Sequence, residues 1–68
     1  MNVPKIRGLI AEHYKNPNAM ANSMGWNPQR LYRILEGKQK ATTEDVFAMA
    51  KALGILESYE DVVSIFIA

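Results

Sequence analysis

The amino-acid sequence predicts an all-α protein, a compact domain of four to five helices. Two observations lead to this fold class. Apolar residues recur at helical spacing along most of the chain, and capping residues and glycines mark the starts and ends of short helices. Sixty-eight residues form one small domain, residues 1–68. Such a chain buries only about 60% of its unfolded surface, so dimerisation would help to stabilise it.

The first four helices are each marked by local signals. An apolar stripe predicts a helix over residues 4–14, and its members are Val3, Ile6, Leu9, Ile10 and Tyr14. In "NPNAMANSMGWNPQR", residues 16–30, Asn-Pro occurs twice. Because Asn is a good N-cap and Pro is favoured at the next position, helices are predicted over 17–24 and 28–36. Gly25 between them suits a left-handed C′ residue.

The second half of the chain is predicted to hold two more helical segments. Thr42 and Asp45 are close to a capping box, and Gly54 is the expected end of that helix. Its expected buried face consists of Val46, Phe47, Met49, Ala50 and Leu53. Ser58 is the expected N-cap of a last helix, but the following "VVSIFIA" is rich in β-branched residues and fits a strand equally well.

The charge distribution is uneven. Residues 1–40 carry seven basic and two acidic side chains, a net charge of +5, whereas residues 41–68 carry one and five, a net charge of −4. Such asymmetry suggests a polyanionic partner for the basic half, although two solvated surfaces of opposite sign would also explain it. The chain has no cysteine, signal peptide or apolar run of membrane-spanning length, so the cytoplasm is the expected compartment.

The sequence does not predict an enzyme. Its one histidine, His13, lies beside apolar residues of the first helix, where a packing or surface role is expected. The carboxylates stand at helix caps rather than in an acid–base pair, and no glycine-rich phosphate loop is present. We therefore expect no catalytic residue, no bound metal and no cofactor.

From Met20 onwards, "MANSMGWNPQRLYRILEGKQKATTEDVFAMAKALGI" resembles the helix-turn-helix of lambda repressor and Cro-like regulators. That family places small, glycine and apolar residues at fixed positions of the motif. The matching residues here are Ala21, Gly25, Trp26, Leu31, Ile34, Gly37 and the run 50–54. The resemblance covers residues 16–55. It implies a lambda-repressor-like fold and a sequence-specific regulator that binds double-stranded DNA, of the Cro repressor type found in phages and prophages.

The predicted helix over 28–36 would read the bases. If its apolar residues face inward, Gln29, Arg30 and Arg33 project outward with Tyr32 beside them. Arginine can pair with guanine O6 and N7, and glutamine with adenine N6 and N7. By resemblance, Gln29 and Arg33 occupy the positions most used for base contacts, whereas Arg30 would reach a base or a phosphate. The alternative is that all three form an ordinary solvated face.

Contacts to the DNA backbone are expected on either side of the motif. Asn16 and Asn27 precede helix N-termini, whose backbone N–H groups can bind phosphate. Lys38 and Lys40 follow the reading helix, where the family's loop commonly meets DNA, or they are simply solvated. The family often has Gln at the positions of Pro17 and Pro28, so the set of contacts should be reduced here.

Residues 57–68 are the candidate dimerisation segment. The residues expected at the interface are Val62, Val63, Ile65 and Phe66. In the resembled family this region commonly forms a homodimer that binds a pseudo-palindromic operator with half-sites about 34–36 Å apart. The alternative is that the segment completes the core of the monomer.

A second function remains open. A helix-turn-helix fold can also serve as a protein-interaction module, such as an antitoxin or a polymerase-binding protein, with weak DNA binding. Ionic strength separates the two functions, because DNA binding falls steeply with added salt and binding of an apolar protein surface does not.

Overall fold

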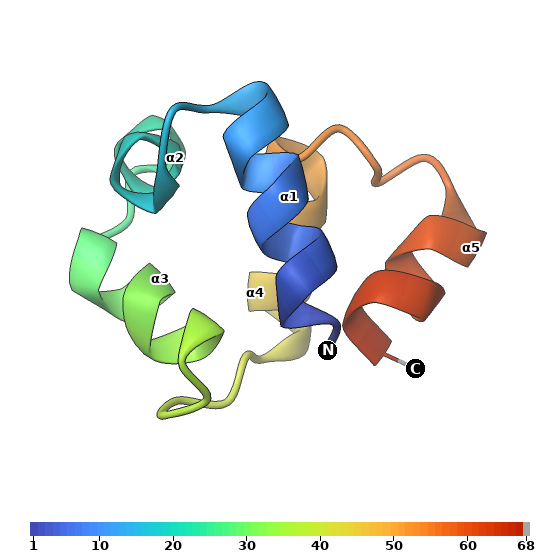
Figure 1. Ribbon diagram of the computed structural model, residues 1–68. Helices are drawn as coiled ribbons and strands as arrows, with labels where there is room; N and C mark the ends of the chain where they lie inside the picture. The colour runs from blue at the N-terminus through green and yellow to red at the C-terminus, as the bar shows by residue number, and fades with distance from the viewer. Residues whose placement is uncertain (68) are drawn as a thin grey trace.

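The computed structural model describes residues 1–67, which form five α-helices and a π-helical turn and contain no strand (Figure 1). The elements in chain order are α1 (Val3–His13), α2 (Pro17–Met24), α3 (Pro28–Leu35), α4 (Thr43–Ala52), α5 (Tyr59–Val62) and the π-turn η1 (Val63–Ile67). The predicted all-α class is confirmed. The domain boundary at residue 68 lies outside the described residues.

Asparagine side chains cap the first three helices. The Oδ1 of Asn2 accepts from Lys5 N at 3.1 Å, that of Asn16 from Ala19 N at 2.8 Å, and that of Asn27 from Gln29 N at 2.9 Å. The two predicted Asn-Pro helix starts are therefore confirmed. The first helix begins and ends one residue earlier than predicted, and α3 ends at Leu35 with Glu36 as its C-cap.

The connection between α2 and α3 is tight because Gly25 adopts a φ of 75°, the left-handed conformation predicted for it. The following residue, Trp26, donates its N–H to Ala21 O at 2.8 Å and so closes the end of α2. Ala21 itself is fully buried, and a larger side chain there would hold α3 away from α2.

The core lies between the helices and takes residues from every helical element. Its fully or nearly fully buried members are Ile6, Ile10, Met20, Ala21, Leu31, Ile34, Leu35, Met49, Ala50, Leu53, Val62, Ile65 and Phe66. One expectation for α4 was wrong. Phe47 is 52% exposed rather than part of the buried face, because the buried side of α4 carries Asp45, Met49 and Ala50, and Phe47 lies on the side of the helix away from Asp45 and Met49.

The C-terminal segment is helical, which decides between the two structures that its sequence fits. Val62, Ile65 and Phe66 are each only 5% exposed in the core of the single chain. The η1 turn packs on α1, and Asn2 N–H donates to Ile65 O at 2.6 Å. This corrects the expected interface, because three of its four residues are covered by the chain itself and only Val63 is half-buried.

Hydrogen bonds define both ends of α4. Its predicted N-terminal signal is a complete capping box, in which Thr42 and Asp45 exchange side-chain and backbone hydrogen bonds. At its other end, Tyr14 Oη donates to Ala52 O at 2.8 Å and ties the end of α1 to the end of α4. In Figure 1, α2 and α3 lie at one side of the molecule and α5 at the other. None of the helices in residues 1–67 is long and apolar enough to cross a membrane.

Candidate nucleic-acid interface

The outer face of α3 carries the exposed polar side chains of the candidate site. The opposite face is anchored in the core by Leu31, Ile34 and Leu35. Gln29 and Arg33, four residues apart, are both exposed and lie on neighbouring turns of one helix face. Tyr32 flanks them and is 37% exposed. Two of the three predicted base-contacting side chains are thus placed together on the surface.

A shallow hollow runs along this face and includes part of the next loop. It is lined by Gln29, Tyr32, Arg33, Glu36 and Lys38. The backbone N–H of Lys38 donates to Arg33 O at 2.9 Å, and this hydrogen bond holds the backbone of Lys38 beside the end of α3. Lys40, farther along the loop, is also exposed but lines a different groove, together with Met1 and Phe66.

Arg30 does not share this exposed face. Its guanidinium forms an ion pair with the carboxylate of Asp45 in the first turn of α4. Its Cζ also lies 4.3 Å from the centre of the Trp26 ring, within cation–π range. Of the three predicted base contacts, Arg30 is the one that is paired within the protein, with 38% of its side chain still exposed.

The two capping asparagines differ in what they leave for an anion. At α3, Pro28 has no N–H, Gln29 N–H is held by Asn27 Oδ1 and Arg30 N–H by Asn27 O, so the first turn is already satisfied. At α2, the Oδ1 of Asn16 holds Ala19 N–H. The N–H of Asn18 has no acceptor among the described residues, so α2 keeps one donor for a phosphate.

Part of the charge asymmetry along the sequence is also seen in space. Arg33, Lys38 and Lys40 are exposed at or after α3. The acidic residues Glu60 and Asp61 belong to α5, on the other side of the molecule from α3 (Figure 1). These exposed cations and the acidic residues of α5 thus lie on opposite sides of the molecule.

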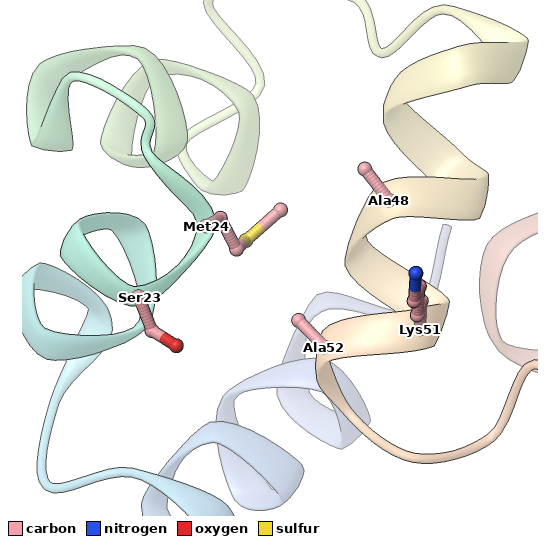
Figure 2. Close-up of a pocket in the computed structure, with 5 residues that line it drawn as sticks. All are labelled: Ser23, Met24, Ala48, Lys51 and Ala52. Atoms are coloured by element: carbon pink, nitrogen blue, oxygen red, sulfur yellow. The ribbon is translucent and has the colours of Figure 1, made fainter.

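A second hollow lies between α2 and α4, as Figure 2 shows. Met24 extends from the end of α2 towards α4, where the small side chains of Ala48 and Ala52 leave space. Ser23 and Lys51 are the polar residues at its rim. The hollow has no carboxylate and no histidine, so it offers neither an acid–base pair nor a set of metal ligands. His13 is exposed on α1, and no metal-binding cluster forms within residues 1–67.

Sequence reasoning missed two features of this interface. Glu36 shares the face of Gln29 and Arg33, at the seventh position after Gln29, and the same helical spacing could have revealed it. The pairing of Arg30 with Asp45 had no local signal, because the two residues are fifteen positions apart in different helices.

Comparison with known proteins gives no relative from which a function could be transferred: no protein-family model, curated protein or solved structure matches the chain.

Proposed function

We propose that the protein is a sequence-specific double-stranded DNA-binding transcriptional regulator of the Cro repressor type. In this proposal α2 and α3 form the helix-turn-helix and α3 enters the major groove. The observation that carries it is the pair Gln29 and Arg33, exposed together on a short helix whose other face is fixed in the core. A rigid helix with a polar outer face and a bordering cation is the arrangement that groove reading requires.

Each exposed group has a role in the proposed complex. Arg33 pairs with guanine O6 and N7, and Gln29 with adenine N6 and N7. Glu36, on the same face, can accept a hydrogen bond from cytosine N4. Lys38 and the free N–H of Asn18 bind phosphates on either side of the groove, and Lys40 adds to the attraction. Arg30 is left out of the reading set because its charge is already paired.

We further propose that the regulator acts as a homodimer through the predicted segment, but through its outer face, which shares only Val63 with the four interface residues expected from the sequence. Tyr59, Val63 and Ile67 recur every four residues along α5 and η1. Tyr59 is 79% exposed and Ile67 66% exposed, so an apolar stripe remains outside after the core is filled. In helix-turn-helix dimers the two reading helices enter successive major grooves about 34–36 Å apart, and the proposed dimer requires the same spacing of its two copies of α3.

The decisive experiment is in vitro selection from random DNA duplexes at two salt concentrations. We expect a two-fold symmetric sequence with half-sites one helical turn apart. Affinity for it should fall steeply with salt, as expected for contacts to about 4–6 phosphates per monomer. Weak binding without sequence enrichment would contradict the proposal.

A protein-interaction module is the second candidate, and the exposed apolar side chains favour it. Phe47 on α4 and Leu56 after it are exposed in addition to the C-terminal stripe. A partner held by these side chains would bind almost equally at low and high salt. Affinity capture with the wild type and a Phe47→Ser variant, at both salt concentrations, tests this function separately from DNA binding.

A further inference from the structure

Three side chains form a continuous line of contacts from the α2–α3 turn to the start of α4. Trp26 follows the turn, Arg30 lies in the first turn of α3, and Asp45 lies in the first turn of α4. The guanidinium of Arg30 stacks on the indole and forms an ion pair with the carboxylate. We refer to these residues as the Trp26–Arg30–Asp45 brace.

Asp45 is the fixed end of the brace. It is only 4% exposed, and both of its carboxylate oxygens are occupied. Oδ1 accepts from Arg30, and Oδ2 accepts from Thr42 N–H at 3.0 Å within the capping box of α4. The capping box of α4 therefore sets the orientation of this carboxylate independently of Arg30. The position of the Arg30 guanidinium is then constrained as well, because its planar N–H donors can pair with a fixed carboxylate in only a few orientations.

The brace limits how α3 can turn about its own axis. The Gly25 turn connects the start of α3 to α2, and the Arg30 side chain connects the same end to α4. Arg30 stands one residue after Gln29 and three before Arg33, so rotation of α3 would break the ion pair and move both exposed side chains together. Base readout depends on such orientation, since hydrogen bonds weaken steeply when they are misaligned.

The brace also removes one positive charge from the DNA-facing side. Arg30 belongs to the helix proposed to enter the groove, yet its charge is paired with the buried carboxylate of Asp45 while 38% of its side chain stays exposed. A free arginine at this place would attract phosphate on any sequence and so raise non-specific affinity. The ion pair thus favours sequence-specific over non-specific DNA binding in two ways. It orients the base-contacting side chains of α3, and it reduces the positive charge available to phosphate.

From this geometry we propose that Asp45 and Arg30 are positioning residues that determine the specificity of DNA recognition without contacting a base. The proposal rests on the DNA-binding function proposed above. Asp45 holds Arg30, Arg30 holds α3, and α3 presents Gln29 and Arg33 in the orientation that distinguishes one sequence from another.

The test measures affinity for the selected sequence and for a scrambled duplex over a range of salt, in the wild type, Asp45→Asn and Arg30→Met. Asp45→Asn frees the arginine, so we expect tighter scrambled-duplex binding with a salt slope steeper by about one phosphate, about 0.9 in log–log slope. The ratio of specific to non-specific affinity should fall about tenfold or more, the equivalent of one well-made base contact. Arg30→Met should lower the ratio similarly without steepening the slope.

Glu44→Gln is the matched control. Glu44 is exposed, neighbours Asp45 in the same first turn of α4, and its substitution makes the same change in net charge. It should leave the ratio nearly unchanged. The double variant of Arg30 and Asp45 should lose no more specificity than Arg30→Met alone, because both substitutions break one contact.

The possible failures can be told apart. If Arg30→Met relaxes preference at a single base pair while Asp45→Asn keeps the full ratio, Arg30 is a base reader and the brace proposal is wrong. If Asp45→Asn only reduces the folded fraction, both affinities fall by the same factor, which also overturns it. A wild type without sequence preference overturns the DNA-binding function itself, and the positioning role with it.

Fluorescence of Trp26 gives a readout that needs no DNA. It is the only tryptophan of the chain and carries the guanidinium of Arg30 on its ring. Its emission should change in Asp45→Asn and Arg30→Met and stay as in the wild type in Glu44→Gln. Identical spectra for the wild type and Asp45→Asn would show that the carboxylate does not hold the arginine in solution, and would overturn the proposal.

Discussion

Two arginines stand three residues apart on α3, and their surroundings give them different roles. Arg33 is exposed on the outer face, whereas Arg30 is taken up by Trp26 and Asp45. The residue type alone would assign both to DNA. The difference arises because an arginine beside a buried carboxylate satisfies that charge first.

Arg33→Ala should weaken binding to the selected operator by about 1–3 kcal/mol and relax preference at one base pair, because the bidentate pair with guanine is lost. Titration of DNA variants at fixed salt measures this. Arg7→Ala, which removes an exposed arginine from α1, serves as the control and should change affinity much less. Equal weakening on every sequence would instead identify Arg33 as a phosphate contact.

Two glycines allow a matched test of backbone conformation. Gly25→Ala should lower the free energy of unfolding by about 1–2 kcal/mol, because alanine is strained at the φ of 75° found there. Gly8→Ala should raise it by about 0.5–1 kcal/mol, since Gly8 lies inside α1 and a Cβ there meets no atom within 4 Å. Chemical denaturation of both variants measures the two changes. A Gly25→Ala protein as stable as the wild type would contradict the first.

At the scale of elements, the start of each helix is determined by residues close together in the sequence. Asparagine, proline and the next few residues contain all the groups that form the cap, so the starts of α2 and α3 could be predicted from the sequence. Features that depend on distant partners could not. The helical form of the segment after Val62 depends on packing against α1, a contact between residues far apart in the sequence.

In the candidate site, too, the features set by local spacing could be predicted from the sequence and those set by distant residues could not. Helical spacing was enough to place Gln29 and Arg33 on one exposed face. It could not place Arg30, because the spacing leaves this residue at the edge of that face and the carboxylate that takes it comes from another helix.

Removal of an N-cap should destabilise one helix without touching the core. Asn16→Ala should lower the free energy of unfolding by about 0.5–2 kcal/mol, because Ala19 N–H loses its acceptor. Asn18→Ala, an exposed substitution in the first turn of the same helix, should have a small effect. Thermal and urea unfolding compare the two. Equal losses would show that the cap contributes nothing beyond helix propensity.

For the whole molecule, the two surfaces proposed to bind DNA and a second copy lie on opposite sides in Figure 1. α3 lies at one side, the C-terminal apolar stripe and the acidic residues of α5 at the other, and the core between them. In such an arrangement a second copy can bind through α5 and η1 without covering α3. In the proposed complex, the acidic side chains of α5 would also keep the dimer contact away from DNA phosphates.

Ile67→Glu should therefore dissociate the proposed dimer, because it puts a charge into an apolar contact while the side chain is solvated in the monomer. Sedimentation velocity at high micromolar concentration should show the monomer for this variant and the dimer for the wild type. Phe47→Glu, an equivalent change on α4, should leave the dimer intact. A wild type that sediments only as a monomer would rule the dimer out.

The hydrogen bond from Asn2 N–H to Ile65 O brings the two ends of the described chain together, beside each other in Figure 1. A short flexible peptide could join them, and the chain could be reopened in the exposed loop between α3 and α4. Such a circular permutant would keep every helix and most of the core contacts while reversing the order in which the two halves leave the ribosome. Its refolding rate, compared with that of the parent chain, would reveal whether the helices must form in sequence or can assemble from either half.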